Sequence, residues 1–323
     1  MPLHVSSRRD FLKTSLFAGA SVALAGCGAT SAKFLTSSAA PIRAADRPER
    51  FALLSDPHIA ADPTHVRDGV NMSANAARAA SEICAVAASL SGVIVSGDCA
   101  YMTGDRADYR NFANVLVHPI LQKGIPLHLM MGNHDHRGHF ESVLGDSFGS
   151  AAVANRCVSI IASRYANWFL LDSLGHTNEI GGEIGDEQLD WLDAALARTA
   201  NTNAIIVAHH PFEDEDLFAK LGMRLRDGGK LWNVLQRHAN VRAYFYGHTH
   251  RWSVERRRGI YLINLPTTAY LFNAGQPRAW TDVLLSRDAI QLRLHSIETP
   301  PRAIPHAATT LALVPSPNQI ALR

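Results

Sequence analysis

Short apolar runs alternate with amphipathic stretches along the chain from Phe51 onward. A short apolar run bounded by polar or Gly residues predicts a buried strand, and apolar positions three or four apart predict a helix. On this basis helices are predicted over 70–90, 106–122 and 186–198. Strands up to residue 246 are predicted at 51–55, 92–96, 125–131, 169–171, 204–208 and 241–246.

Beyond Gly247 the helical spacing fades and strand patterns follow one another. These strands are predicted at 252–257, 259–264, 280–286 and 289–295. Residues 298–323 contain five prolines and no steady period, so we expect an irregular C-terminal tail. Strand–helix alternation that gives way to strands indicates a layered α/β domain.

The start of the chain has the pattern of an export signal. Arg8 and Arg9 precede Phe11-Leu12-Lys13, and an apolar stretch follows over 16–25. That stretch is too short to span a bilayer core of ~30 Å, which indicates a signal peptide. The arginine pair resembles the twin-arginine signal of bacteria, which implies the twin-arginine export machinery as a partner.

Two alternatives for maturation remain open. The segment that ends in Cys27 resembles a lipoprotein box, which implies a lipid anchor on that cysteine. Cleavage after Ala25 would instead release the protein without an anchor. Residues 28–48, rich in Ala, Ser and Thr, would form a flexible tether. We therefore expect the mature protein in the periplasm, either free or as a membrane-anchored lipoprotein.

Composition narrows the class of partner. The chain has 323 residues, of which 47% are apolar and 19% charged, as expected for a globular protein with a sizeable core. Its 31 basic and 29 acidic residues give a net charge of +2, so no broad positive field favours long nucleic acid. Sixteen histidines are present, and histidine is the commonest metal ligand.

Clusters of Asp, Asn and His follow five of the predicted strands. In chain order they are Asp56-Pro57-His58, Gly97-Asp98, Gly132-Asn133-His134-Asp135, His209-His210-Pro211 and Gly247-His248-Thr249-His250. Ligand sites of open α/β sheets gather beyond the C-terminal ends of the strands, so these side chains are expected in one crevice. Their mixture of nitrogen and oxygen ligands suits iron, manganese or zinc better than calcium or magnesium.

The five blocks, in this order, resemble the calcineurin-like metallophosphoesterase superfamily from Phe51 to His295. The resemblance implies a four-layer α/β/β/α sandwich of two mixed sheets flanked by helices. With the export pattern and the tail, this divides the chain into a signal peptide and tether over 1–48, a catalytic domain over 49–297 and a Pro-rich tail over 298–323. The block Gly132-Asn133-His134-Asp135 followed by Arg137 is most similar to the bacterial cyclic-nucleotide phosphodiesterase branch. His136 stands where that branch has an acidic residue, which leaves the identity of the substrate open.

The resemblance implies two metal ions that share Asp98. The two ligand sets would be Asp56, His58, Asp98 and His250, and Asp98, Asn133, His209 and His248. The family's His-x-Pro pattern selects His209, which leaves His210 outside the ligand sets. The implied reaction is hydrolysis of a phosphomonoester or phosphodiester, such as a small nucleotide-like ester, by metal-bound hydroxide. The alternative is an exported metal-binding envelope lipoprotein without catalytic activity.

Two residues beyond the ligands are implied to be catalytic. His134 would protonate the leaving oxygen or stabilise the transition state, and Asp135 would orient its ring. A structural histidine held by Asp135 is the alternative. Arg137 and His139 are candidate contacts to the substrate phosphate, or else the solvated start of the next helix. We expect specificity to depend on the loops 100–106, 136–150 and 173–185.

Overall fold

The computed structural model describes residues 47–145, 152–213, 222–299, 304 and 307–313. These residues belong to the unit Ile42–Arg323. The arginine pair, the apolar stretch and Cys27 lie outside the described residues, so the predicted export signal and lipid anchor stay predictions. In the part of the chain that is described, no helix has the length and apolar character needed to cross a membrane.

The first sheet is mixed and has the strand order β14-β13-β12-β1-β4-β5. Its parallel half is formed by β1, β4 and β5, and β12, β13 and β14 extend it as antiparallel neighbours. The strands are β1 (Glu49–Leu54), β4 (Gly92–Val95), β5 (Leu127–Leu129), β12 (Ala279–Leu285), β13 (Ala289–Ser296) and β14 (Ala308–Ala312). The parallel half therefore points three strand ends in one direction.

The second sheet is also mixed, with the order β10-β11-β9-β8-β7-β6. Its four central strands are parallel and both edge strands are antiparallel. The strands are β6 (Ser159–Ala162), β7 (Ala166–Leu170), β8 (Asn203–Val207), β9 (Val241–Tyr246), β10 (Ser253–Arg257) and β11 (Ile260–Asn264). A separate small hairpin joins β2 (Val66–Arg67) to β3 (Val70–Asn71).

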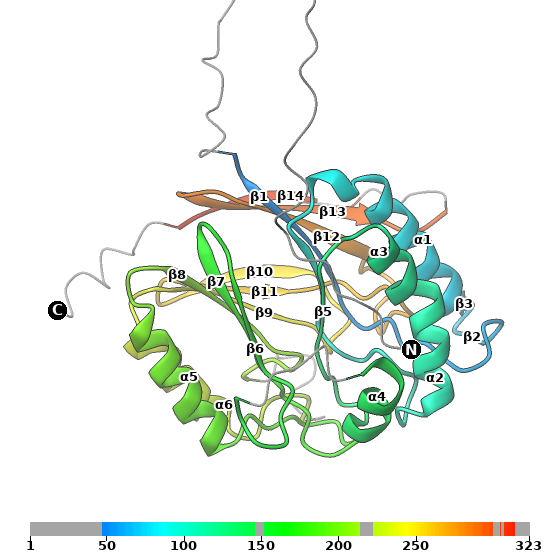
Figure 1. Ribbon diagram of the computed structural model, residues 1–323, viewed down its shortest axis with the longest axis horizontal. Coiled ribbons are helices and arrows are strands. Elements are labelled where there is room, and N and C mark those ends of the chain that lie inside the picture. Colours follow the sequence, from blue (N-terminus) through cyan, green and yellow to red (C-terminus); the bar gives the residue numbers. More distant parts are fainter. Residues whose placement is uncertain (1–46, 146–151, 214–221, 300–303, 305–306, 314–323) are drawn as a thin grey trace, which may run out of the picture. The chain divides into compact units, whose positions relative to one another are not determined.

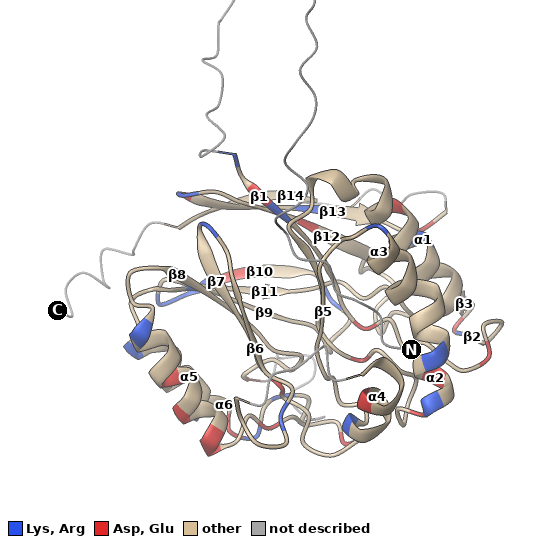
Figure 2. Cartoon of the chain, viewed as in Figure 1, with Lys and Arg blue, Asp and Glu red and all other residues tan. Residues whose placement is uncertain are grey.

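Helices cover the outer faces of both sheets, with α1, α2 and α3 on one side and α5 and α6 on the other (Figure 1). They are α1 (Met72–Ala85), α2 (Arg106–Phe112), α3 (His118–Gln122), α4 (Arg137–Leu144), α5 (Asp186–Arg198) and α6 (Gly228–Arg237). A π-helical segment over Ala113–Val117 connects α2 to α3. Helix α5 has Asp186 and Glu187 in its first turn and Arg198 in its last, so one end is red and the other blue in Figure 2, an arrangement that complements the helix dipole.

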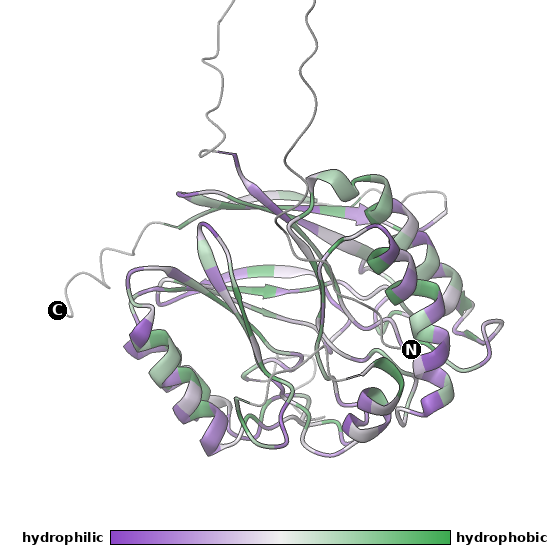
Figure 3. Ribbon diagram, viewed as in Figure 1, coloured by the Kyte–Doolittle hydropathy of each residue, from purple (hydrophilic) through white to green (hydrophobic). Residues whose placement is uncertain are grey.

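Three buried apolar cores separate four layers. The first core lies between the first sheet and its helices and contains Val95 and Ile83. The second lies between the second sheet and α5 and α6 and contains Ile206 and Leu192. The third fills the space between the sheets and contains Trp168. The central strand β8 is mostly apolar, whereas helix α5 shows both polar and apolar residues (Figure 3). Two packed sheets with helices on their outer faces confirm the predicted α/β/β/α sandwich.

Several elements differ from the sequence prediction. The expectation of an irregular tail is wrong for Ala308–Ala312, which pairs with β13 as β14. The reason is that Leu311 and Leu313 are buried in the core between the sheets. Helix α6 was not predicted, although Leu231 and Leu235 give it an apolar face. The two glycines with which it begins disfavour a helix in a single-sequence analysis.

Candidate metal centre

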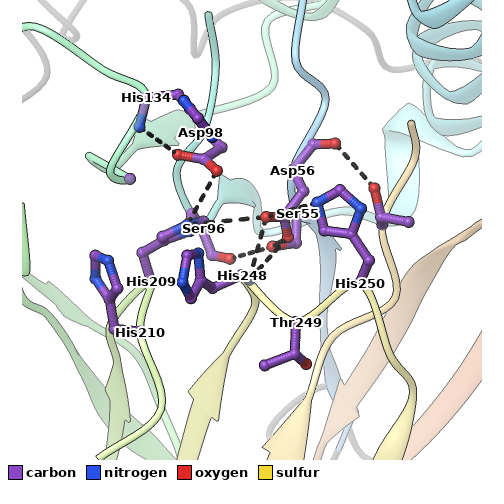
Figure 4. A network of polar contacts seen from close by, with 12 residues as sticks. Ser55, Asp56, Ser96, Asp98, His134, His209, His210, His248, Thr249 and His250 are labelled. Atoms are coloured by element: carbon purple, nitrogen blue, oxygen red, sulfur yellow. Dashed lines mark hydrogen bonds and ion pairs between the residues drawn. The ribbon is translucent and has the colours of Figure 1, made fainter. Parts of the chain in front are cut away.

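Seven predicted metal ligands converge where strands of both sheets end. The first sheet contributes Asp56 and His58 after β1, Asp98 after β4 and Asn133 after β5, and the second contributes His209 after β8 and His248 and His250 after β9. Figure 4 labels Asp56, Asp98, His209, His248 and His250 among them. All seven ligands are buried, and none is more than 4% exposed. The structure therefore confirms that the sequence blocks meet in one place.

The carboxylate of Asp98 lies between the histidines of the two predicted ligand sets. Its Oδ2 is 3.5 Å from His58 Nε2 and 3.3 Å from His209 Nε2. The carboxylate of Asp56 is on the same side, with Oδ1 3.5 Å from His250 Nε2. Because a carboxylate has two oxygens, Asp98 is suited to be shared between two cations.

Backbone carbonyls fix the direction of two imidazole rings. His209 Nδ1 is 2.8 Å from the carbonyl oxygen of Ser96, and His250 Nδ1 is 2.7 Å from that of Tyr270. Each carbonyl accepts the Nδ1 hydrogen, so the other nitrogen, Nε2, points into the cluster. Metal-binding histidines are commonly held in this way, which sets both tautomer and ring orientation.

Three predicted ligand atoms are buried without a hydrogen-bond partner. They are Oδ1 of Asn133, Nε2 of His209 and Nε2 of His248. Buried polar atoms are nearly always paired, and cations would satisfy these atoms. Groups of three possible ligand atoms, all within 4.8 Å of one another, also occur here, for example in Asp56, His58 and His250 and in Asp56, Asp98 and His209. The residues present therefore fit two metal ions.

Five of the seven ligands have left-handed backbone conformations. The φ angles are 53° for Asp56, 47° for His58, 51° for Asp98, 67° for His248 and 51° for His250. Such angles are uncommon outside glycine and cluster at functional sites. The strands thus end in turns that direct these side chains into the crevice.

Glycines allow the loops to approach one another closely. A Cβ on Gly132 would lie 2.1 Å from Oδ1 of Asp98, and a Cβ on Gly247 would lie 1.9 Å from Oγ of Ser55. Ser55 in turn hydrogen-bonds to Oδ2 of Asp56. The glycines of the sequence blocks are therefore required because the ligands occupy the space that a side chain would need.

Burial and charge set the protonation of the ligands. Burial lowers the pKa of His58 to about 3, so this ring is neutral. Burial alone would also lower the pKa of His209, but the carboxylates of Asp98 and Asp56 outweigh it and raise this pKa to about 9. The pKa of Asp98 lies well below its usual range, because the nearby histidines outweigh its burial. Neutral imidazole and ionised carboxylate are the forms that bind cations, so a cation would displace the second proton of His209.

His134 lies at the edge of the cluster, but Asp135 does not orient its ring. The Nδ1 of His134 is 2.7 Å from the carbonyl oxygen of Met102, and its backbone N–H donates to Oδ1 of Asp98. Nδ1 therefore has a different partner from the one predicted. The remaining ring nitrogen, Nε2, is available to the pocket that His134 lines.

Asp135 instead organises the backbone around the metal ligands. Its buried carboxylate accepts hydrogen bonds from the backbone N–H groups of Cys99, Ala100 and Gly132. It also accepts the hydroxyl hydrogen of Tyr109. Burial and the neighbouring Asp98 raise the pKa of Asp135 to about 6. The prediction that Asp135 orients His134 is wrong, because the carboxylate faces these backbone groups.

The two candidate phosphate contacts have other partners. Arg137 donates from Nε and Nη2 to the buried carboxylate of Asp172 at 2.7 and 2.8 Å. His139 is stacked on His136 and bonds through Nδ1 to the carbonyl oxygen of Gly104. Neither Arg137 nor His139 lines the pocket at the cluster. The structure thus gives both residues structural contacts in place of the predicted one.

His210 lies closer to the cluster than its predicted place outside the ligand sets suggests. Its Nδ1 is 2.8 Å from Oγ of Ser173, and its Nε2 is buried without a hydrogen-bond partner. A ligand atom of His210 lies within 4.8 Å of those of His209 and His248. Ser173 Oγ also accepts the backbone N–H of His209, so the contact of His210 with Ser173 places His210 next to the ligand His209.

A pocket of about 200 Å³ opens over the cluster. Besides ligands and His134, it is lined by five residues that were not singled out from the sequence, namely Asn178, Ile180, Met223, Tyr270 and Phe272. Two of them come from the predicted specificity loop 173–185, whereas no described residue of 100–106 or 136–150 lines the pocket. A larger hollow of about 580 Å³ beside Arg78 and Arg278 contains none of the ligands.

Comparisons with known proteins agree with this geometry. A family model described as calcineurin-like phosphoesterase matches residues 49–252. The chain is 31% identical over 236 residues to a probable cyclic nucleotide phosphodiesterase of Rhodococcus erythropolis (strain PR4 / NBRC 100887), covering 69% of this chain and 72% of the relative. It is 34% identical over 160 residues to a cAMP/cGMP dual specificity phosphodiesterase of Mycobacterium tuberculosis (strain CDC 1551 / Oshkosh). That match covers 49% of this chain and about half, 48%, of the relative. The chain belongs to the calcineurin-like phosphoesterase family.

Solved structures share the fold. A dimetal phosphatase from Danio rerio matches with a TM-score of 0.64 at 14% identity, covering 83% of this chain and 100% of that one. The purple acid phosphatase PPD1 from yellow lupin seeds matches with a TM-score of 0.61 at 13% identity, covering 83% and 54%. At such identities the likeness shows the fold alone. Family membership and the converging ligands make this protein a metal-dependent phosphoesterase with a site for two metal ions.

Proposed function

We propose that the protein hydrolyses small phosphodiesters of the cyclic-nucleotide type. The observation that carries this proposal is the complete ligand set beneath a small pocket, with His134 at its edge. Relatives that align with 69% to 77% of this chain are named probable cyclic nucleotide phosphodiesterases, which supports a diester substrate. The pocket of about 200 Å³ is small beside the ~300–1,000 Å³ typical of ligand sites, which favours a compact ester.

In this reaction a water oxygen bonds to phosphorus, one ester P–O bond breaks, and the leaving oxygen gains a proton. Two bound divalent cations would lower the pKa of water towards ~7 and stabilise charge on the phosphate oxygens. Asp98 would contribute to both cation sites, with Asp56, His58 and His250 on one side and Asn133, His209 and His248 on the other. These ligands, rich in nitrogen, favour iron, manganese or zinc.

His134 is placed to supply the proton. Its Nδ1 donates to the carbonyl oxygen of Met102, so an imidazolium ring carries its second proton on Nε2. Transfer of that proton to the leaving oxygen returns the ring to the neutral form, with the Nδ1 hydrogen still bonded to Met102. General acid catalysis of this kind contributes ~10²–10⁴-fold in rate.

The test combines metal content with turnover of cAMP, bis(p-nitrophenyl) phosphate and p-nitrophenyl phosphate by wild type and Asn133→Ala. We expect about two metal ions per chain, a preference for the diesters, and loss of metal and of turnover in the variant. A preference for p-nitrophenyl phosphate would reject the diesterase. Two metals without turnover of any ester would favour the non-catalytic metal-binding alternative.

We further propose that the protein is exported by the twin-arginine route and acts in the periplasm, free or anchored through Cys27. The arginine pair at Arg8 and Arg9 and the apolar stretch after it support this proposal. Replacing both arginines with lysine should retain precursor in the cytoplasm. Normal export of that variant would reject the route, and labelling with a radioactive fatty acid in wild type but not in Cys27→Ser would distinguish the anchored form.

A further inference from the structure

The pocket above the metal centre has two chemically different surfaces. One is formed by metal ligands and His134, and the other by Asn178, Ile180, Met223, Tyr270 and Phe272. The second surface has no Asp, Glu, Lys or Arg among the described residues that line it. A substrate group that extends beyond the phosphate therefore meets an uncharged wall.

Phe272 presents a flat aromatic surface at this wall. Its ring is nearly parallel to that of His250, with an interplanar angle of 9° and 4.2 Å between the ring centroids. The side chain is nevertheless 48% exposed. Five large apolar side chains in the described part of the chain are at least 41% exposed, and two of them, Phe272 and Ile180, line this one pocket. Exposed apolar residues gathered at a pocket mark a binding surface.

Hydrogen bonds fix the position of this wall relative to the metal ligands. The backbone N–H of Asn178 donates to the carbonyl oxygen of Asn133 at 2.6 Å. Thr177 Oγ1 donates to the carbonyl oxygen of Asp135 at 2.8 Å. On the other side, Phe272 packs on the ring of a metal ligand, His250. The spacing between the phosphate site and the wall is thus set by direct contacts.

We propose that Phe272 stacks against the nucleobase of the substrate, with Ile180 as a second apolar contact, and so determines specificity for nucleotides. The proposal rests on the proposed function, because the phosphate has to occupy the metal centre. A nucleobase is flat and uncharged, and every type of base can stack on an aromatic side chain.

Two other occupants fit the wall less well. A second phosphate group would require Lys or Arg, and none is found among the described residues that line the pocket. A quaternary ammonium group requires several open aromatic faces. The Tyr270 ring has the guanidinium of Arg67 at 3.9 Å and the His58 ring at 5.1 Å, so its faces are not open to such a group.

The test is binding of AMP and ribose 5-phosphate to the full chain loaded with Mn²⁺, measured by calorimetry. The two probes share sugar and phosphate and differ in the base. We expect wild type to bind AMP roughly ten- to a hundredfold more tightly than ribose 5-phosphate. Phe272→Ala should reduce this ratio to within about threefold, Phe272→Trp should keep it, and metal content should stay at the wild-type level in both.

A matched control is Leu121→Ala, because Leu121 is 44% exposed but does not line the pocket. That variant should keep the wild-type ratio. Equal affinities of wild type for the two probes, or an equal loss of both in Phe272→Ala, would overturn the stacking proposal. Phe272-dependent AMP binding without cAMP hydrolysis would support stacking and reject the proposed activity. Hydrolysis of cAMP with equal affinities for AMP and ribose 5-phosphate would support the proposed activity and reject stacking.

Discussion

The hydroxyl of Tyr109 donates to Oδ1 of Asp135 across 3.0 Å and accepts the backbone N–H of His136 across 2.8 Å. The side chains of Tyr109 and Asp135 are completely buried. One phenol therefore links helix α2 to the loop that follows β5 and carries Asn133 and His134. The conformation of this part of the metal centre depends on a helix outside it.

Replacing Asp135 with Asn should weaken the fold and the metal site together. The amide keeps one acceptor oxygen and turns its NH₂ towards backbone N–H groups that now donate to the carboxylate. We expect the free energy of unfolding to fall by about 3 kcal/mol and metal content to drop. Denaturant titration and metal analysis measure both. Unchanged stability and metal content with a lower kcat would instead assign Asp135 to the chemistry.

Replacing His134 with Ala should reduce turnover without removing metal. With cAMP as substrate we expect kcat to fall by ~10²–10⁴-fold, because a sugar oxygen needs a proton to leave. With bis(p-nitrophenyl) phosphate the loss should be smaller, because p-nitrophenolate leaves readily without one. Steady-state rates for both substrates give the comparison. An equal loss for the two would argue against proton donation by His134.

Arg137→Ala should destabilise the protein without weakening substrate binding. The variant would leave the buried carboxylate of Asp172 without its two-pronged partner, at an expected cost of ~3–5 kcal/mol. Thermal unfolding and KM measurements distinguish stability from binding. Arg106→Ala is the control, because Arg106 makes an exposed hydrogen bond to Ser142 and should change stability by less than about 0.5 kcal/mol. A raised KM at unchanged stability would restore Arg137 as a phosphate contact.

Asp282 should make stability depend on pH in the acid range. Its two carboxylate oxygens accept hydrogen bonds from Nε and Nη2 of Arg50, each at 2.8 Å, and so connect β12 to β1. Burial alone would raise the pKa of Asp282, but contacts with His295 and Arg50 outweigh it and lower this pKa. The ionised carboxylate therefore stabilises the fold above the unfolded pKa of ~3.9, and this contribution is lost as the pH falls through the lower folded pKa.

At pH 7, Asp282→Asn should thus lower the free energy of unfolding by ~1.5–3 kcal/mol. The difference from wild type should shrink as the pH falls below ~4. Urea titrations at several pH values measure it, with the exposed Asp288→Asn as a control. A difference that stays constant from pH 7 to pH 3 would contradict the assigned role.

The candidate metal ligands could be picked out from the sequence because their signals are local. Asp98 follows a buried apolar run and a glycine, and the other ligand blocks are placed in the same way after their strands. Parallel strand ends meet at one edge of a sheet, which brings together the blocks that belong to the same sheet. That the two sheets meet at the site, and that there are four layers, was implied by the family resemblance.

The roles of His134, Arg137 and Phe272 could not be read in this way, because their partners are distant in sequence. Met102 holds the ring of His134, and Asp172 holds the guanidinium of Arg137. The exposure of Phe272 follows from how the segment after β11 lies across His250. Such contacts depend on tertiary packing, which the local pattern of apolar and polar residues does not predict.

The left-handed backbone of five candidate ligands, among them Asp56 and Asp98, sets metal binding against the thermal stability of the chain. A residue with a Cβ in this conformation loses about 1–3 kcal/mol relative to glycine, which adopts it freely. Asp98→Gly would therefore relieve local strain while it deletes the shared carboxylate. A descendant of this protein released from selection for hydrolysis is expected to drift towards glycine at these turns and to melt at a higher temperature than its metal-free ancestor.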